Sequence, residues 1–226
     1  MLDIGSGWGW LVIRAAQVYG VKAVGITLSE AQYNASNEKI RANGLESNAH
    51  VQLLDYMDLD PGKMQFDKIV SVGMFEHVGK ASMPQYMEKV EKLLKPGGLS
   101  LLHTISGIRE GTYNSWTDKY IFPGSYIPSL REVISLLPEY DFHLLHAESL
   151  RMHYARTLDN WYQNFSNHLP EVKAKFGDRF IRMWRLYLLS NAANFRSSGL
   201  DLYQLLFTKG LNNDLPLTLD SIYRDA

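Results

Sequence analysis

The first nine residues, MLDIGSGWG, constrain the fold of this chain more than any other segment. Met1–Ile4 has the pattern of a β-strand, and the turn that follows it contains Gly5, Gly7 and Gly9. Closely spaced glycines allow the backbone to approach a ligand where any Cβ would clash. The segment therefore predicts a strand and a ligand-binding loop at the start of an α/β sheet.

The spacing of these glycines restricts the class of ligand. A dinucleotide fingerprint would need a glycine at position 10, which is Trp10, and no Lys-Ser or Lys-Thr pair completes a P-loop. G-x-G-x-G after a strand that carries Asp3 suits a smaller nucleoside ligand, and S-adenosylmethionine is the first candidate. A structural turn is the alternative, because short glycine patterns recur by chance. Central strands usually have about five or six residues, so we expect a segment upstream of Met1–Ile4 to be missing.

Composition limits the class of protein. With 226 residues, 46% apolar and 21% charged, the chain is expected to form one globular domain, residues 1–226. Its net charge of −1 provides no overall attraction to nucleic acid or to an anionic membrane. No apolar run approaches the ~18 residues of a membrane span, and no signal-peptide pattern is present, which favours a cytoplasmic location. The absence of cysteine excludes disulfides, thiolate catalysis and cysteine-ligated zinc.

Strand and helix patterns alternate along the chain with short connections, which predicts an α/β fold with a mostly parallel sheet. The strand-like runs are Met1–Ile4, Lys22–Leu28, His50–Asp55, Phe66–Val72, Leu99–Ile105, Phe142–Leu150 and Leu202–Thr208. The helical patterns are Trp10–Tyr19, which is expected to be buried, Ser29–Ala42, Ser82–Lys95 and Ser129–Leu137.

Two segments break this alternation. Ser106–Ile127 is predicted to be a long loop of the kind that often forms a lid, and its aromatic residues are Tyr113, Trp116, Tyr120, Phe122 and Tyr126. Thr157–Ser198 is predicted to be a helical insertion before the last strand, rich in aromatic residues. Within it, Arg179, Arg182 and Arg185 surround Trp184. A basic helix edged by aromatics suits anionic lipid head groups, although a solvated helix face is the commoner explanation.

Five consecutive predicted strand ends carry glycine or polar chemistry, and in open α/β sheets ligands bind beyond these carboxyl ends. After the second strand, Thr27, Ser29 and Gln32 are available to a ribose; alternatively, Ser29 and Gln32 have the spacing of a helix capping box. After the third strand, Asp58 can accept from an adenine amino group and Met57 can cover its ring. The cofactor residues expected on this basis are Asp3, Gly5, Gly7, Gly9, Thr27, Leu28, Ser29, Gln32, Met57 and Asp58.

Glu76 follows a buried strand, and His103 ends the neighbouring one. An acid at such a rim is partly desolvated, which raises its pKa and suits it to holding a proton. The alternatives are a carboxylate favoured by a helix N-terminus and a structural core histidine. No metal is expected, since His143 and His146 fall on opposite faces of a predicted strand.

Seven stretches make the chain resemble the catalytic domain of the cyclopropane-fatty-acyl-phospholipid synthases, a family that includes the mycolic acid cyclopropane synthases. These stretches are LDIGSGWG, VGITLSEAQ, FDKIVSVGMFEHVGK, LLKPGGLSLLHTI, KYIFPGSYIPS, LRMHYARTLDNW and Phe195-Arg196, and they run in order across residues 1–207. The resemblance implies a class I S-adenosylmethionine-dependent methyltransferase fold: a seven-stranded, mostly parallel sheet with a helical insertion, about 157–198.

The resemblance also implies a reaction. A cis double bond of a phospholipid acyl chain attacks the sulfonium methyl group, a base removes a proton, and a cyclopropane closes. In such enzymes the base is thought to be bicarbonate, held by groups that correspond to Glu76, His103, the backbone of Ile105, and Tyr154, together with an upstream cysteine. Glu76 would accept from the bicarbonate hydroxyl, because two bare anions repel, while His103 and Tyr154 would donate.

Three departures from the family pattern are visible: the upstream cysteine is absent, Ser6 replaces a cysteine of the glycine loop, and Asn191 stands where relatives usually carry another cysteine. The partners implied are unsaturated phospholipid acyl chains and the periphery of a membrane, with no nucleic acid; a homodimer stays open. Simple C-methylation of the double bond, N-methylation of a small amine and a non-catalytic remnant remain as alternatives.

Overall fold

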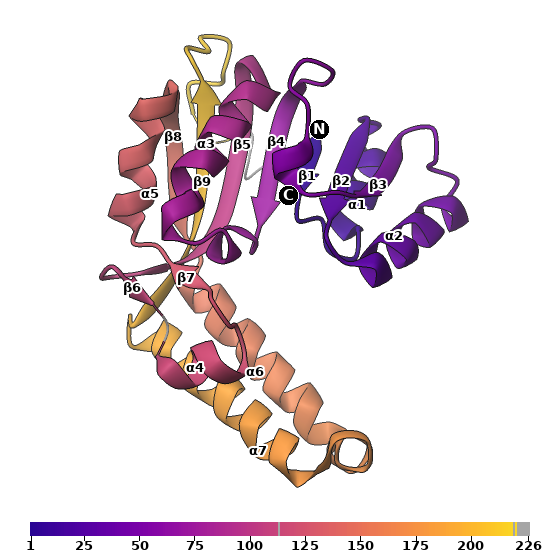
Figure 1. Cartoon of the computed structure of the whole chain (residues 1–226), viewed down its shortest axis with the longest axis vertical. Coiled ribbons are helices and arrows are strands. Elements are labelled where there is room, and N and C mark those ends of the chain that lie inside the picture. The colour runs from indigo at the N-terminus through magenta and orange to yellow at the C-terminus, as the bar shows by residue number, and fades with distance from the viewer. Residues whose placement is uncertain (113, 219, 221–226) are drawn as a thin grey trace.

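The structure is a computed structural model that describes residues 1–112, 114–218 and 220. Its centre is a seven-stranded sheet in the order β3-β2-β1-β4-β5-β9-β8 (Figure 1). The strands are β1 (Leu2–Ile4), β2 (Ala23–Thr27), β3 (Ala49–Leu53), β4 (Phe66–Val72), β5 (Leu94–Gly107), β8 (Phe142–Ser149) and β9 (Leu200–Lys209). β1 to β5 pair in parallel, and β9 runs antiparallel to both β5 and β8. The seven-stranded, mostly parallel sheet predicted from the sequence is therefore confirmed.

Helices pack against this sheet because their apolar residues recur at the helical period. They are α1 (Trp10–Tyr19), α2 (Glu30–Ala42), α3 (Met83–Leu93) and α5 (Leu130–Leu136), with short 3-10 turns η1 (Tyr56–Asp58), η2 (Phe75–His77), η3 (Lys80–Ser82) and η4 (Leu137–Tyr140). In α3, the buried residues Met83, Tyr86, Met87, Val90 and Leu93 follow i, i+3, i+4, i+7 spacing. Burying each large apolar side chain contributes roughly 1.5–3 kcal/mol.

Two hydrophobic clusters flank the sheet. One joins β1, β4 and β5 to α3 and α5, and the other joins β2 and β3 to α1 and α2. The expectation that α1 is buried is wrong for half of its surface: Val12, Ile13 and Ala16 are buried, whereas Trp10 is 67% and Tyr19 75% exposed. A helix beside a sheet buries only one face, so an unbroken apolar run overstates its burial.

The predicted Ser106–Ile127 loop is also corrected, since it contains regular structure. Its first residues extend β5 to Gly107; β6 (Gly111–Thr112) pairs with β7 (Tyr126–Ile127), and α4 (Ser115–Tyr120) lies between them. Tyr113 lies outside the described residues. The segment is therefore a folded connection that places Trp116 and Phe122 against the helical insertion.

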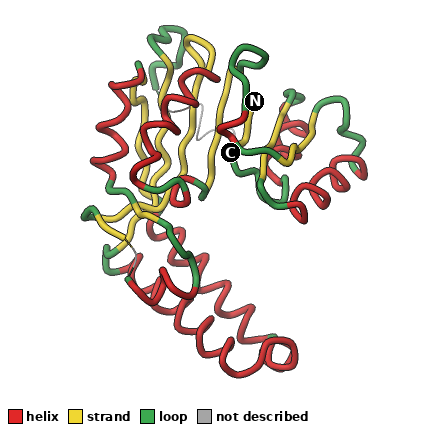
Figure 2. Tube along the Cα trace, viewed as in Figure 1, coloured by secondary structure: helices red, strands yellow, loops and turns green. Residues whose placement is uncertain are grey.

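The helical insertion is a hairpin that projects away from the sheet (Figures 1 and 2). It consists of α6 (Arg151–Asn167) and α7 (Leu169–Arg196), so helix begins at Arg151, before the predicted Thr157. Gly177 interrupts α7 with a φ of 77°. A third hydrophobic cluster holds the hairpin together. None of the described helices has the length and apolarity needed to cross a membrane.

Candidate active site

A cleft of about 820 Å³ opens where the carboxyl ends of β1, β2, β3 and β4 meet. Seven of the residues expected from the sequence to bind a cofactor line it: Gly5, Gly7, Thr27, Leu28, Ser29, Gln32 and Met57. Parallel strands bring segments that are far apart in sequence to one edge, as the positions of the strand ends predict. The cleft has the place and the polar lining expected of a nucleoside site.

Gly5 and Gly7 differ in what surrounds them. Both adopt positive φ, 81° and 55°, a region that favours glycine. A Cβ on Gly5 would lie 2.8 Å from Cγ of Met74, whereas a Cβ on Gly7 would meet nothing within 4 Å. Gly5 is thus required by packing inside the protein, and Gly7 faces the open space of the cleft.

Beyond β2, the polar residues bond to one another. Oγ1 of Thr27 donates to Oε1 of Gln32 at 2.7 Å, and the Ser29 N–H donates to Oγ1 of Thr27 at 3.2 Å. The Gln32 N–H donates to Oγ of Ser29 at 3.4 Å, which caps α2. The capping box is therefore only half formed, because the Gln32 side chain bonds to Thr27 and not to the Ser29 N–H. Gln32 also lines the cleft.

Three predicted cofactor residues do not line this cleft. Asp3 is only 2% exposed within β1, and burial raises its pKa to about 7. Gly9 has Ser36 of α2 beside it, so that a Cβ there would lie 2.8 Å from Cβ of Ser36. Asp58 is exposed on η1. Asp55, Tyr56 and His77 also line the cleft. They lie at the strand ends Asp55–Asp58 and Gly73–His77, where the sequence predicts ligand binding, although they were not among the expected cofactor residues.

A second, smaller pocket of about 210 Å³ adjoins the cleft and shares Val72, Gly73 and His77 with it. All four residues predicted to be catalytic line this pocket: Glu76, His103, Ile105 and Tyr154. The other lining residues are Phe122, Ser125, Tyr187 and Leu202. Groups separated by up to 78 positions along the chain are thus gathered next to the cofactor cleft; their catalytic roles stay predictions.

Glu76 is the most unusual of these groups. It is 4% exposed, its Oε1 accepts from the Ile105 N–H at 2.5 Å, and its Oε2 is buried without a hydrogen-bond partner among the described residues. Burial raises the pKa of Glu76 above its ordinary value, although the Ile105 N–H opposes this shift. A buried carboxyl oxygen without a partner is costly, so it indicates a site built for a donor from outside the chain.

His103 on β5 is oriented by Gln204 on the neighbouring strand, β9. Nε2 of Gln204 lies 3.2 Å from Nδ1 of His103. Because an amide NH₂ group only donates, Nδ1 accepts, and a neutral imidazole then carries its proton on Nε2. Burial lowers the pKa of His103, which favours this neutral form.

Aromatic rings from the helical hairpin and the α4–β7 connection enclose the pocket. Tyr154 packs edge-to-face on Phe195 with ring centroids 4.9 Å apart, and Tyr187 packs in the same way on Phe122 at 5.9 Å. Burial, reinforced by the nearby Glu76 charge, raises the pKa of Tyr154, so its hydroxyl stays protonated and able to donate. The hairpin therefore supplies one wall of the site.

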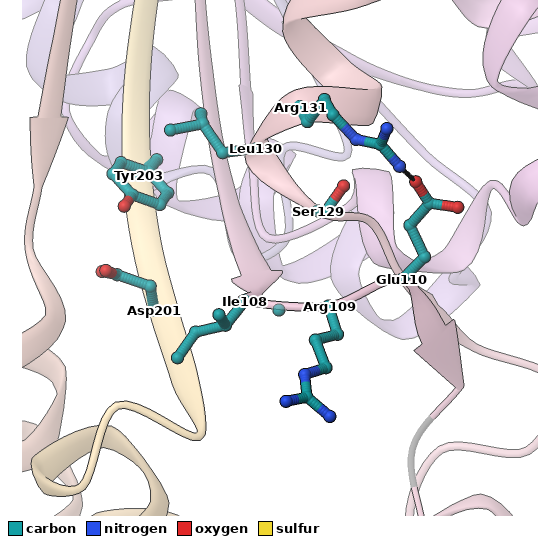
Figure 3. A pocket seen from close by; sticks show the side chains of 9 residues that line it. Ile108, Arg109, Glu110, Ser129, Leu130, Arg131, Asp201 and Tyr203 are labelled. Atoms are coloured by element: carbon teal, nitrogen blue, oxygen red, sulfur yellow. Dashed lines mark hydrogen bonds and ion pairs between the residues drawn. The ribbon is translucent and has the colours of Figure 1, made fainter.

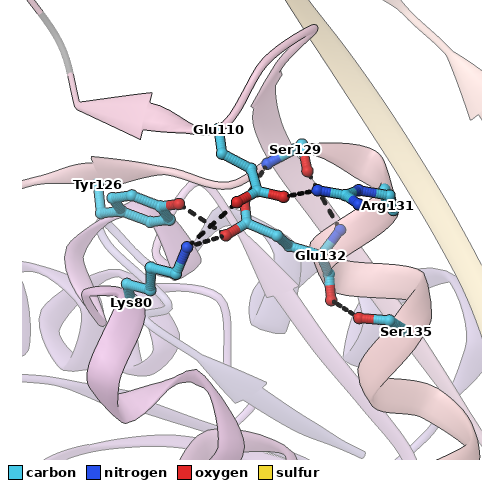
Figure 4. A network of polar contacts seen from close by, with 7 residues as sticks. All are labelled: Lys80, Glu110, Tyr126, Ser129, Arg131, Glu132 and Ser135. Atoms are coloured by element: carbon cyan, nitrogen blue, oxygen red, sulfur yellow. Dashed lines mark hydrogen bonds and ion pairs between the residues drawn. The ribbon is translucent and has the colours of Figure 1, made fainter.

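An ion-pair network fixes the segment that follows Glu76 (Figure 4). Nζ of Lys80 lies 2.8 Å from Oε1 of Glu132, which also accepts from the Tyr126 hydroxyl at 2.7 Å. Although burial alone would raise it, these contacts and the Ser129 N–H lower the pKa of Glu132 to about 2. The network ties η3 to β7 and to the start of α5, where Ser129 and Glu132 form a complete capping box.

A separate pocket of about 570 Å³ lies near the end of β5 (Figure 3). Arg109, Glu110, Arg131 and Tyr203 are among its lining residues, and Arg131 is paired with Glu110. None of the residues predicted from the sequence to bind or react lines it. Among the described residues, no cluster of three His, Asp or Glu side chains suits a metal ion.

Comparison with known proteins identifies the family to which this chain belongs. Residues 1–205 match the family model described as mycolic acid cyclopropane synthetase. The chain is 40% identical over 220 residues to the cyclopropane-fatty-acyl-phospholipid synthase of Escherichia coli (strain K12), covering 95% of this chain and 54% of that protein. It is 38% identical over 234 residues to a probable fatty acid methyltransferase of Pseudomonas putida, covering 99% and 59%. The chain thus spans little more than half the length of these relatives.

A solved structure shows the same arrangement. Mycolic acid cyclopropane synthase CmaA1, complexed with SAH and CTAB, superposes with a TM-score of 0.85 at 30% identity, covering 92% of this chain and 77% of that one.

Proposed function

Because the chain belongs to the mycolic acid cyclopropane synthetase family, we propose that it transfers a methyl group from S-adenosylmethionine to the cis double bond of an unsaturated acyl chain carried by a phospholipid. Its sheet has the class I S-adenosylmethionine-dependent methyltransferase fold that the sequence predicts. The observation that carries the proposal is the buried Glu76 carboxyl with one unpartnered oxygen, next to His103 and Tyr154 and beside the cofactor cleft.

The cofactor occupies the larger cleft in this proposal. S-adenosylmethionine supplies an electrophilic methyl group there. Gly7 gives it backbone access, while Ser29 and Gln32 offer polar contacts to its ribose and Met57 an apolar surface to its adenine. His77 lies on the wall that the two pockets share, so a cofactor held by the cleft would present its methyl group to the smaller pocket. The bound SAH in CmaA1 supports a cofactor of this kind.

Glu76, His103 and Tyr154 form an anion site in the smaller pocket. Oε2 of Glu76 needs a donor, while Nε2–H of His103 and the Tyr154 hydroxyl need acceptors. Bicarbonate fits this donor set, since it has one hydroxyl and two further oxygens; when bound it would supply a base. The Ile105 N–H is engaged with Glu76, so Ile105 acts by positioning that carboxyl.

The aromatic wall serves the reaction by excluding water. Attack of the alkene electron pair on the methyl carbon breaks the C–S bond and leaves a cation on the acyl chain. Transfer of a proton from the new methyl group to the base held by Glu76, His103 and Tyr154 would then close the three-membered ring. Phe122, Tyr154 and Tyr187 keep water away from that cation, and their π-faces stabilise positive charge.

The test is a methyl-transfer assay with isotopically labelled S-adenosylmethionine. The chain is incubated with detergent-dispersed unsaturated phospholipid, with the saturated counterpart and with small amines, and products are followed by mass spectrometry. We expect the mass of one CH₂ group to be added to the unsaturated lipid only. Equal labelling of saturated lipid, or labelling of amines alone, would contradict the proposal. Loss of the alkene signal in the product distinguishes a cyclopropane or a saturated methyl branch from an alkene product.

A further inference from the structure

The helical hairpin α6–α7 carries a net positive charge, unlike the rest of the chain. Residues 151–196 contain eight Lys or Arg and three Asp or Glu residues, a net charge of +5. The whole chain has a net charge of −1, so the remaining residues together carry −6. A projecting element with charge opposite to that of the body is suited to an anionic partner.

Three arginines of this hairpin have no acidic partner. Among the described residues, its ion pairs are Lys173–Asp178 and Arg196–Asp159. Arg179, Arg182 and Arg185 are all exposed and take no part in them. They follow one another at three-residue intervals on α7, so they project from one side of the helix. Three of the six cations of the hairpin that form no ion pair among the described residues therefore lie on this side.

Apolar side chains lie next to these arginines on the same side. Leu186 and Leu189 are 52% and 45% exposed, and they continue the row of Arg179 and Arg182 at helical spacing. A groove of about 310 Å³ runs between α4 and α7, lined by Trp116, Tyr120, Arg179, Arg182, Met183 and Leu186. Arginine, aromatic and leucine side chains in one surface are the combination found where helices rest in a lipid interface.

The same helix borders the reaction pocket from its other side. Trp184 and Tyr187 of α7 have ring centroids 5.0 Å apart, and Tyr187 lines the pocket that contains Glu76. The helix α7 therefore presents the arginines and leucines on one side and Tyr187, which lines the proposed reaction site, on the other.

We propose that the outer side of α7, together with the facing edge of α4, docks on the surface of an anionic phospholipid bilayer. Arg179, Arg182 and Arg185 contact lipid phosphates, while Leu186 and Leu189 insert among the upper acyl segments. This rests on the proposed function, which makes a phospholipid the substrate. It adds the surface used and the preference for anionic lipid.

The experiment is a flotation assay with the 226-residue chain and vesicles of phosphatidylglycerol or of phosphatidylcholine at low salt. The test variant is R179Q/R182Q/R185Q, which removes three charges. Since each cation near an anionic membrane contributes about 1 kcal/mol, the loss of three should weaken binding to phosphatidylglycerol by roughly 100-fold. Sodium chloride at about 1 M, where the Debye length is about 3 Å, should weaken wild-type binding to a similar extent.

Two controls accompany it. R14Q/K22Q/R41Q removes three exposed cations from the sheet side of the molecule and should bind as wild type does. R179K/R182K/R185K keeps the charge and should retain most of the binding. Equal binding of the glutamine variant and wild type, equal loss in the sheet-side variant, or equal binding to both lipids would overturn the proposal. Flotation with neither vesicle would also overturn it, and an acidic protein would then be the alternative partner of the basic surface.

Activity in detergent separates this inference from the proposed function. The glutamine variant should methylate detergent-dispersed unsaturated lipid at the wild-type rate, because none of its three positions lines the reaction pocket. If wild type floats with anionic vesicles but methylates no lipid, the proposed function fails while the docking surface stands. If wild type methylates dispersed lipid but its flotation is unaffected by the three substitutions, the docking surface alone fails.

Discussion

The cofactor cleft and the reaction pocket adjoin, yet they are assembled in different ways. The cleft is lined by residues between Ile4 and Gln85, and most of its lining comes from loops directly after consecutive parallel strands. The pocket draws on residues between Val72 and Leu202, from β4, β5, β9, the α4–β7 connection and both helices of the hairpin. One is a local construction repeated at each strand end, and the other depends on distant segments.

This difference predicts how the two will respond to substitution. In the cleft, backbone conformation matters most, because glycine positions create the space. In the pocket, the proposed function assigns the chemistry to a few side chains, which their neighbours hold in place. Substitutions in the pocket should therefore abolish turnover with little change in cofactor binding. Substitutions in the glycine loop should weaken cofactor binding and change turnover at saturating cofactor much less.

The largest effect is expected for Glu76→Gln. The amide keeps the shape of the carboxyl but cannot accept through both terminal atoms, so the anion site loses its charge and the Oε2 acceptor. We expect methyl transfer to fall by about 10³-fold, while S-adenosylmethionine affinity, measured by titration calorimetry, changes less than threefold (~0.6 kcal/mol). Parallel loss of binding and turnover would show that the two regions are not separable at this residue.

Gly5→Ala and Gly7→Ala test the cleft in the opposite sense. Each forces a Cβ into positive φ at a cost of about 1–2 kcal/mol, but only at Gly5 would it also strike Met74, 2.8 Å away. Gly5→Ala should therefore lower the thermal unfolding midpoint more. Gly7→Ala should weaken S-adenosylmethionine binding by roughly tenfold, or about 1.4 kcal/mol, because its Cβ enters open space at the cleft. Cofactor affinity equal to wild type in Gly7→Ala would exclude a close approach of ligand at that residue.

Tyr154→Phe sharpens the comparison within the pocket. The ring keeps its edge-to-face contact with Phe195, centroids 4.9 Å apart, while the hydroxyl donor is lost. A hydrogen bond to a charged group contributes about 1.5–3 kcal/mol, so turnover should fall roughly 10- to 100-fold. Addition of bicarbonate at increasing concentration should recover part of the rate in this variant. A rate that is insensitive to bicarbonate in both wild type and variant would contradict the anion site.

The same division explains what could be predicted from the sequence. The sheet, most cleft residues and the gathering of Glu76 and His103 follow from strand ends, because parallel strands share one edge. Placement of Tyr154 came only from family resemblance, since no local pattern shows that α6 folds back towards β5. Burial of α1 was overestimated because a helix beside a sheet buries only one face. The elements β6, α4 and β7 were missed because very short elements owe their structure to tertiary packing more than to periodicity.

The orphaned Glu76 oxygen, the Gln204 contact that fixes the His103 tautomer and the Lys80–Glu132 tether were also invisible in the sequence. The Gln204–His103 and Lys80–Glu132 contacts join residues 101 and 52 positions apart, beyond the reach of any local motif. They are the features that hold the reaction pocket in place, and so they decide how far it depends on distant parts of the fold.

The smallest effect is expected for Glu132→Gln, which tests that dependence. The pKa of Glu132 is lowered to about 2 from an ordinary value of 4.5. Because the folded-state pKa is depressed, the stability it contributes is fully present above pH 4.5 and is lost as pH falls from there towards 2. We expect Glu132→Gln to lower stability by about 1 kcal/mol at neutral pH, with the difference in unfolding midpoint shrinking across that acidic range. If the tether also positions Glu76, the variant should lose a few-fold in turnover at unchanged cofactor affinity; Lys92→Gln, which breaks the exposed Lys92–Glu88 pair on α3, is the control and should lose neither. A midpoint difference that persists undiminished to pH 2 would mean that the charge of Glu132 is not what holds η3 against α5, and the reaction pocket would then owe its geometry to apolar packing alone.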